Sequence, residues 1–506
     1  MISKFMTRPI LLSVFSGLLT GLGYPGYGLT FLVWVALIPF FFALKEADTV
    51  KARFWCGWRA GFVFFLVTLP WLLSLWDWAS IFIVFGYLIL CAALGMAWGF
   101  WAMGCGWVIH RPILLALLAP AWMVLIDFVR GSTDVGFAWG YLGYSLADQL
   151  WLVQLAAWAG IWGLSFVVIF VNVSLWLAWQ KKQIGWGLVA MTTLIGLGIF
   201  GYSQNQEISN LMTDAPTIEI VMIQPNIPQK EKSNPMNLRQ LRHGYEDLLE
   251  TVASSADLIV LPESMLPTLI LDDVETFDML ANYAQRNEAE LLFGSFTRDE
   301  GQLFNSVLLS NAQKAPLGQF DKVQLVPFST EYFPLIEVIR DIGFDQLLRN
   351  LPLGALTRGQ GFTPLKGINA SIGAPICFET SFSWVSREFV REGANVLISV
   401  TNDAWFKDSV ELEQHFAKGV VRAVETGRAF VQVANTGTSG AALPTGEVIE
   451  KLPTLQAVTG SATVPLLTHQ TFYVVWGDWV VGLALLIFGI CVAIRAFGAQ
   501  SSQPST

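Results

Sequence analysis

The chain has 506 residues, of which 54% are hydrophobic and 14% charged, and its mean hydropathy is +0.52. These values exclude a wholly soluble protein. The charge is uneven, because residues 1–204 carry 16 charged side chains with a net charge of +4, whereas residues 205–468 carry 51 with a net charge of −13. The acidic second part argues against a nucleic-acid partner. We therefore predict an integral membrane protein with one hydrophilic domain.

Eight apolar segments approach the length of about 20 residues that a helix needs to cross a bilayer. The first two are short and could instead form a hairpin around Gly23–Tyr27. The first could also be a cleaved signal peptide, although no small-residue cleavage site follows it. The eight segments are Pro9–Gly23, Thr30–Leu44, Trp55–Leu75, Ser80–Val108, Pro112–Phe128, Trp151–Trp179, Gly185–Gly201 and Thr471–Ile494.

Basic residues predict the orientation, because cytoplasmic loops are enriched in lysine and arginine. If the N-terminus is cytoplasmic, the basic residues of five loops or ends fall on the cytoplasmic side, and Arg130 is the main exception. Residues 205–468 then form an extracytoplasmic domain. This domain lies between a bundle of about seven spans in residues 1–204 and a C-terminal span with a short cytoplasmic tail in residues 469–506.

Strand-like and helix-like segments alternate in the hydrophilic part. Continuous apolar strands separated by helices are typical of an α/β sheet that is covered on both faces. We expect strands at Thr217–Gln224, Ala256–Leu261, Glu290–Phe296, Phe304–Ser310, Ser371–Phe378, Asn395–Thr401, Ala429–Ala434 and Gly440–Pro444, and helices at Met236–Ser254, Val274–Asn287, Phe382–Glu392 and Val410–Arg428.

Three side chains with catalytic potential lie in this part: Glu263 in LPES, Lys322 in FDKVQLVPF and Cys377 in GAPICFE. Glu263 and Cys377 are expected at the ends of strands, where α/β sheets gather their ligands. A helix N-terminus after Cys377 would favour its thiolate, a glutamate could accept the thiol proton, and a lysine could stabilise an oxyanion. The residues alone leave open a core cysteine, a solvated glutamate and a surface lysine.

Neither a disulfide nor a metal site is expected in the hydrophilic part. The five cysteines contain no CxxC pair, and only Cys377 lies outside the apolar segments. The four histidines show no ligand spacing, so we predict no metal, and we expect no cofactor.

Taken together, the three segments resemble the nitrilase superfamily, whose catalytic triad is Glu-Lys-Cys. The rest of the chain resembles the membrane-integrated branch of that superfamily, the apolipoprotein N-acyltransferases, over nearly its whole length. The resemblance implies a layered αββα sandwich for the hydrophilic part. The motifs that carry it, in chain order, are GYPGYGL from Gly23, WVALIP from Trp34, QPNIPQ from Gln224, TNDAWF from Thr401, ETGR from Glu425 and NTG from Asn435.

The resemblance implies a two-step acyl transfer. The Cys377 thiolate would attack a phospholipid ester, typically of phosphatidylethanolamine, and the resulting thioester would acylate the α-amine of an N-terminal diacylglyceryl-cysteine on an apolipoprotein. Glu263 would be the base and Lys322 would hold the oxyanion. This chemistry would place the catalytic domain of a monomeric enzyme on the periplasmic side of the bacterial inner membrane, with both termini cytoplasmic.

Other positions match supporting residues of that family. Glu331 and Glu379 would orient the site, Asn305 would support the pocket, and Trp405 and Phe406 would lie near the acyl chain.

Four departures separate this chain from the family pattern. Phe378 replaces a tyrosine, Ser233 replaces a tryptophan thought to gate substrate access, and Lys407 replaces a glycine. The segment Val326–Glu331 is one residue longer than usual, which leaves the position of Glu331 open.

Two other functions remain open from the sequence. A membrane-tethered amidase or nitrilase would use water as the second nucleophile, and a transporter or receptor would carry a degenerate domain. The intact triad and the nearly uncharged spans favour the acyltransferase. We expect the loops Gly131–Gln149 and Asp341–Gly359 to gate the site, because they are glycine-containing and lie between elements.

Overall fold

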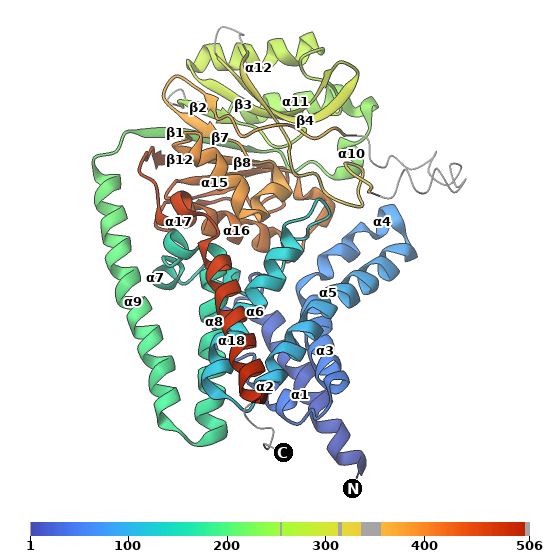
Figure 1. Ribbon diagram of the computed structural model, residues 1–506. Helices are drawn as coiled ribbons and strands as arrows, with labels where there is room; N and C mark the ends of the chain where they lie inside the picture. Colours follow the sequence, from blue (N-terminus) through green and yellow to red (C-terminus); the bar gives the residue numbers. More distant parts are fainter. Residues whose placement is uncertain (1, 253–255, 312–315, 335–355, 501–506) are drawn as a thin grey trace, which may run out of the picture. The chain divides into compact units, whose positions relative to one another are not determined.

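The computed structural model describes residues 2–252, 256–311, 316–334 and 356–500, with residues 2–6, 181, 316 and 496–500 described by their backbone alone. The chain divides into two compact units (Figure 1). The helical unit comprises Met1–Ser132, Ala138–Asn205 and Trp476–Thr506, and the α/β unit comprises Thr133–Phe137 and Gln206–Val475.

The helical unit consists of long helices joined by short turns. Its elements are α1 (Ile2–Leu22), η1 (Thr30–Trp34), α2 (Ile38–Lys45), α3 (Val50–Thr68), η2 (Pro70–Leu75), α4 (Trp76–Ala79), α5 (Ile81–Trp107), α6 (Pro112–Gly131), η3 (Leu142–Leu146), α7 (Leu150–Val153), α8 (Ala156–Lys181), α9 (Ile184–Thr213) and α18 (Trp479–Gln500).

Four of these helices, α5, α6, α8 and α9, are long and apolar enough to cross a membrane. A fifth span results if α3 and the η2–α4 segment, which are bent by 56°, are counted as one. These four or five correspond to predicted spans three to seven. Within the described residues, the first, second and eighth predicted spans form shorter apolar helices at Thr7–Leu22, Thr30–Lys45 and Trp479–Arg495. The number of eight spans therefore stays a prediction.

Arg130, the exception to the pattern of basic residues, is partly buried within the helical unit at the end of α6. Its guanidinium pairs with Asp127 at 2.8 Å and donates to the carbonyl of Trp139 at 2.6 Å. It also lies over the rings of Phe65 and Tyr141. Because the charge is neutralised internally, Arg130 does not have to follow the charge rule for loops.

Two six-stranded sheets form the α/β unit. The first has the order β12-β1-β2-β3-β4-β5, and the second has the order β11-β10-β9-β8-β7-β6. The three strands β1, β2 and β3 are parallel, as are β7, β8 and β9, and the outer strands pair antiparallel. The strands are β1 (Thr217–Gln224), β2 (Leu258–Val260), β3 (Glu290–Asp299), β4 (Gln302–Ser310), β5 (Pro316–Asp321), β6 (Leu365–Lys366), β7 (Ser371–Gly373), β8 (Val396–Thr401), β9 (Phe430–Ala434), β10 (Gly440–Ala442), β11 (Val448–Lys451) and β12 (Val458–Pro465).

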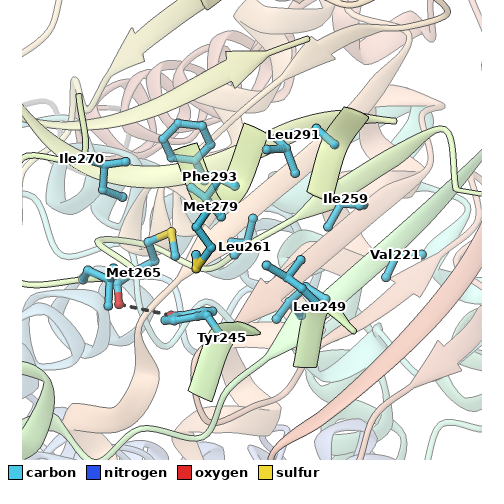
Figure 2. Close-up of a cluster of buried hydrophobic side chains, with 14 of the residues drawn as sticks. Val221, Tyr245, Leu249, Ile259, Leu261, Met265, Ile270, Met279, Leu291 and Phe293 are labelled. Atoms are coloured by element: carbon cyan, nitrogen blue, oxygen red, sulfur yellow. Dashed lines mark hydrogen bonds between the residues drawn. The ribbon is translucent and has the colours of Figure 1, made fainter. Parts of the chain in front are cut away.

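Helices cover the outer face of each sheet within this unit, which confirms the predicted αββα sandwich (Figure 1). Side chains from the first sheet, such as Ile259 and Leu291, pack with Leu249 and Met279 in a buried core (Figure 2). The unit's helices are α10 (Gln229–Lys232), η4 (Pro235–Asn237), α11 (Leu238–Leu249), α12 (Val274–Asn287), η5 (Cys377–Ser381), α15 (Ser383–Arg391), η6 (Asp403–Phe406), α16 (Glu411–Thr426) and α17 (Phe472–Trp476).

The strand predicted at Ser371–Phe378 is wrong in its second half. Strand β7 ends at Gly373, and Cys377 begins the 3₁₀ turn η5. Pro375 has no N–H to donate to a neighbouring strand, and the N–H of Ile376 donates to the Glu379 carboxylate at 2.8 Å. The apolar segment therefore leaves the sheet at Cys377.

Candidate active site

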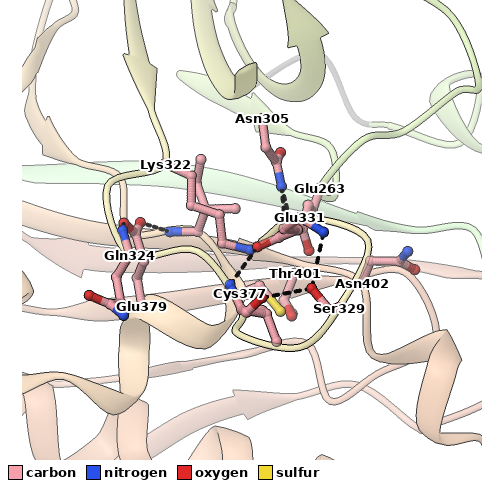
Figure 3. Close-up of polar contacts among 12 residues, drawn as sticks. Glu263, Asn305, Lys322, Gln324, Ser329, Glu331, Cys377, Glu379, Thr401 and Asn402 are labelled. Carbon is pink, nitrogen blue, oxygen red and sulfur yellow. Dashed lines mark hydrogen bonds and ion pairs between the residues drawn. The ribbon is translucent and has the colours of Figure 1, made fainter. Parts of the chain in front are cut away.

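The three predicted catalytic residues come from separate elements of the two sheets. Glu263 lies three residues after β2, Lys322 follows β5 directly, and Cys377 begins η5 after β7. Figure 3 shows all three, together with Glu331, gathered around one point. The structure therefore brings together side chains that are 59 and 55 positions apart in the sequence.

Glu263 is buried and ionised. One of its carboxylate oxygens accepts from Asn305 Nδ2 at 2.7 Å and from Lys322 Nζ at 3.3 Å. Burial alone would raise the pKa of Glu263, but the Lys322 ammonium and the Asn305 hydrogen bond outweigh it and hold the pKa below its ordinary value. A carboxylate of this kind is available as a proton acceptor.

Lys322 lies between two carboxylates. Its side chain is 1% exposed, and Nζ is 2.7 Å from Glu331 Oε1 and 3.3 Å from Glu263 Oε1. Burial acts to lower the pKa of Lys322, but the charges of Glu263 and Glu331 raise it well above the ordinary value. Lys322 is thus a cation held in a fixed position, and a positive charge placed in this way can stabilise an oxyanion.

The longer segment before Glu331 does not prevent its side chain from reaching the cluster. Besides its contact with Lys322, Glu331 accepts from Asn305 at 3.3 Å and from the N–H of Val326 at 2.8 Å. Ser329 closes the turn, since its hydroxyl donates to the Val326 carbonyl at 2.7 Å and accepts from the Glu331 N–H at 3.0 Å. The extra residue is absorbed within this turn.

Cys377 is half-buried, and its backbone is left-handed with φ of 51°. Burial raises the pKa of the Cys377 thiol well above its ordinary value, the Glu263 charge raises it further, and Lys322 opposes both. The predicted helix at Cys377 begins as the five-residue 3₁₀ turn η5. Burial beside the Glu263 carboxylate disfavours the thiolate and so opposes the predicted effect of the helix N-terminus.

Glu379 joins the segment after Lys322 to the turn that carries Cys377. It is fully buried, and its carboxylate accepts from the N–H groups of Val323 at 2.7 Å, Gln324 at 2.8 Å and Ile376 at 2.8 Å. Burial raises the pKa of Glu379 to about 7 although these hydrogen bonds lower it. Glu379 is therefore placed to fix the spacing between cation and nucleophile.

Further residues around the Glu263, Lys322 and Cys377 cluster are those that depart from the family pattern and the two aromatic residues predicted near the acyl chain. Phe378 is buried, with its ring centroid 5.1 Å from that of Phe382. Ser233 is exposed and accepts from Gln229 Nε2 at 3.0 Å, so an exposed hydroxyl stands at the proposed gate position. Trp405 and Phe406 are half-buried in η6, and Lys407 follows with φ of 52°. The role of Trp405 and Phe406 at the acyl chain stays a prediction.

Of the two predicted gating loops, the structure describes the first, whereas most of the second is not described. Positions 341–355 lie outside the described residues. Of the first loop, the segment Thr133–Phe137 belongs to the α/β unit. There Asp134 pairs with Arg358 at 2.7 Å, and the rings of Phe137 and Phe378 are 6.5 Å apart.

Four residues of the site were not predicted from the sequence. Lys232 is buried and donates to the Glu263 carbonyl at 2.8 Å, and its pKa is lowered to about 8 by burial. Thr401, Asp403 and His415 surround Cys377 from the other side. The motif TNDAWF contains Thr401 and Asp403. Lys232 lies in a polar stretch, and His415 lies on a helix in which the apolar face gives the main signal.

Asp403, Glu411 and His415 are the one group of metal-ligand type found in the described part of the chain, with donor atoms within 4.8 Å of one another. His415 Nδ1 faces the two Asp403 oxygens at 3.1 and 3.2 Å, which hydrogen bonding explains. Burial and the Asp403 charge raise the pKa of Glu411 well above its ordinary value, which disfavours the carboxylate that would bind a cation. The group fits a hydrogen-bonded cluster better than a cation site.

Comparison with known proteins covers both units. The family model described as apolipoprotein N-acyltransferase N-terminal domain matches residues 16–174, and the carbon-nitrogen hydrolase model matches residues 222–472. A curated apolipoprotein N-acyltransferase of Gloeobacter violaceus is 29% identical, with 98% of this chain and 96% of that protein covered. One of Pasteurella multocida is 28% identical, with 96% and 95% covered. A solved CN-hydrolase superfamily protein of Xanthomonas campestris is 17% identical with a TM-score of 0.38, and the match covers 57% of this chain and 98% of that one.

Proposed function

The chain belongs to the apolipoprotein N-acyltransferase family, the membrane-integrated branch of the nitrilase superfamily, and we propose that it N-acylates apolipoproteins through a thioester on Cys377. The observation that carries this proposal is the placement of Lys322 at 3.3 Å from Glu263 and 2.7 Å from Glu331, with Cys377 in the electrostatic field of Glu263 and Lys322. A base, a cation and a thiol in one buried site are the groups that acyl transfer needs.

In the first step, Glu263 takes the proton of the Cys377 thiol, and the sulfur attacks the carbonyl carbon of a phospholipid ester. Lys322 stabilises the negative charge that develops on the carbonyl oxygen. The C–O bond then breaks, the proton passes from Glu263 to the leaving alkoxide, and a lysophospholipid departs. We propose phosphatidylethanolamine as the donor.

In the second step, the α-amine of a diacylglyceryl-cysteine attacks the thioester carbonyl. Glu263 removes a proton from this amine, the C–S bond breaks, and the thiol of Cys377 is restored. Glu331, Glu379 and Asn305 would hold the geometry in both steps, because each bonds directly to a reacting group or to its neighbouring backbone.

We place this chemistry on the periplasmic side of the inner membrane, with both termini cytoplasmic and the enzyme monomeric. The four or five helices able to cross a membrane support the membrane placement, and the distribution of basic residues supports the orientation. The domains we propose are a bundle in residues 1–204, a catalytic domain in residues 205–468 and a C-terminal span with its tail in residues 469–506.

The test is the intact mass of the full-length protein in detergent after incubation with phosphatidylethanolamine, beside a Cys377→Ser variant. We expect a gain of one acyl mass on the native protein alone, and its transfer to the amine of an added diacylglyceryl-cysteine peptide. An adduct that water removes but the peptide does not would favour a hydrolase. No adduct on folded protein, with several phospholipids tried, would overturn the proposal.

A further inference from the structure

Side chains outside the predicted triad lie at both the sulfur and the backbone carbonyl of Cys377. Figure 3 shows the Thr401 side chain next to that of Cys377, and the Thr401 hydroxyl acts to lower the pKa of the thiol. Thr401 Oγ1 also donates to Asp403 Oδ1 at 2.8 Å. Asp403 faces His415 Nδ1 at 3.1 Å, and His415 Nε2 lies 3.0 Å from the carbonyl oxygen of Cys377. The contacts close into a ring that starts and ends on Cys377.

The hydrogen-bonding capacity of each group gives this ring a single direction. A carbonyl oxygen only accepts, so His415 Nε2 carries a proton and donates it to Cys377. One further proton lies between His415 Nδ1 and Asp403. Thr401 has a single proton, which it gives to Asp403, so its oxygen is left to accept from the thiol of Cys377.

The same hydroxyl can serve the thiolate. When the base removes the thiol proton, Thr401 can rotate its proton from Asp403 to the sulfur, because a hydroxyl both donates and accepts. Asp403 then keeps its contact with His415. A donor to the charged form of a group favours that form, so Thr401 would stabilise the thiolate that attacks the ester.

Burial and packing support a positioning role. Thr401 and Asp403 are fully buried, and His415 is 1% exposed. One turn further along α16, Lys418 donates to Ser381 at 3.0 Å, so this helix holds both the first and the last residue of η5. Cys377 has the left-handed backbone that non-glycine residues adopt rarely, and such a conformation persists where its surroundings fix it.

We propose that Thr401, Asp403 and His415 are positioning residues that orient the Cys377 sulfur, and that the Thr401 hydroxyl stabilises its thiolate. This inference rests on the proposed function for its purpose, since the thiolate is the proposed nucleophile. The ring itself can be tested without any lipid substrate.

The test is the pH dependence of Cys377 alkylation by iodoacetamide, read on the peptide that contains Cys377 in full-length protein. In Thr401→Val, which lacks the hydroxyl, we expect the apparent pKa of the thiol to rise by about one to two units, so that alkylation below that pKa slows about 10- to 100-fold. Thr401→Ser, which keeps the hydroxyl, should restore the native profile. The titratable groups that surround the thiol stay the same in both variants: Glu263, Lys322, Lys232, Asp403, His415 and Lys418.

A second variant should shift the profile in the opposite direction. Asp403→Asn removes a negative charge that raises the pKa of Cys377, so the apparent pKa should fall. Thioester formation should nevertheless slow, because His415 loses its charged partner.

The possible results distinguish a failure of the proposed ring from a failure of the proposed function. An unchanged midpoint in Thr401→Val, with or without a loss of activity, would assign Thr401 to packing and overturn the inference. A shifted midpoint in Thr401→Val with native behaviour in Thr401→Ser would support it. If the native protein formed no acyl adduct while the alkylation shift persisted, the ring would stand and the proposed function would fail.

Discussion

Replacing Lys322 by methionine should destabilise the α/β unit in a pH-dependent way. The change keeps much of the side-chain volume but leaves the buried carboxylate of Glu263 and the partly buried carboxylate of Glu331 without their shared cation. At separations of 3.3 and 2.7 Å and an effective dielectric constant of 20, the two attractions amount to about 5 and about 6 kcal/mol. Desolvation of the ions offsets much of this, and breaking a buried pair costs about 3–5 kcal/mol net.

The pH dependence follows from the directions of the pKa shifts. In the native protein the pKa of Glu263 is depressed, so its stabilisation is present above the unfolded pKa of about 4.3 and is lost on acidification. In Lys322→Met, burial raises the pKa of this carboxyl instead, so stability is lost as pH rises. Each carboxyl that takes up a proton relieves about 1.4 kcal/mol per pH unit, or about 3 kcal/mol between pH 7.5 and 5.5.

Hydrogen exchange of peptides from β2 to β5, measured on full-length protein at both pH values, would report the local free energy of opening. We expect a penalty of about 3–5 kcal/mol at pH 7.5 that largely disappears at pH 5.5. The triple variant Glu263→Gln/Lys322→Met/Glu331→Gln carries no charge here and should show no such pH dependence. An equal penalty at both pH values for the single variant would refute the assignment of a buried ion cluster.

Two further predictions concern the supports of the site. Glu379→Gln should leave one backbone N–H, such as that of Ile376, facing an amide donor, which costs about 1–3 kcal/mol; thioester formation should slow while the secondary structure is kept, and native rates would argue against a spacing role. Gly294→Ala should displace Glu263, because a Cβ at this strand position would collide with the Glu263 backbone; we expect a loss of about 1–3 kcal/mol together with lower activity. Gly244→Ala, on an open helix face, is the matched control and should gain about 0.5–1 kcal/mol with native activity.

The strands that sequence patterning identified are those buried on both faces. Thr217–Gln224 matches β1 to the residue, because a continuous apolar run leaves little freedom of assignment. The edge strand Val458–Pro465 was missed, since five of its eight residues remain partly or fully exposed and its apolar pattern is weak. Strand β7 was predicted too long because hydropathy does not register the missing N–H of Pro375.

Residues of the site could be predicted from the sequence where a reactive side chain lies within an apolar segment. Glu263, Lys322 and Cys377 were found in this way, but the charged face of α16 was not. Its apolar face, with Leu412 and Phe416, is typical of an amphipathic helix, a pattern in which the opposite face usually meets solvent. The structure buries both faces, so His415 becomes part of the site. Burial of a charged face depends on tertiary packing and leaves no periodic signal in the sequence.

The pKa shifts of Glu263 and Cys377 disfavour a free thiolate. The pKa of Glu263 is lowered and that of Cys377 is raised, so transfer of the proton from sulfur to carboxylate is unfavourable by itself. Thiolate is the form that alkylating and oxidising agents attack. In the proposed acyl transfer, an ester carbonyl beside Lys322 would take up negative charge from the sulfur on its oxygen, next to the ammonium, and proton transfer would become favourable as the C–S bond forms. Deprotonation would then be coupled to attack, with Glu263 as the base and Lys322 as the cation.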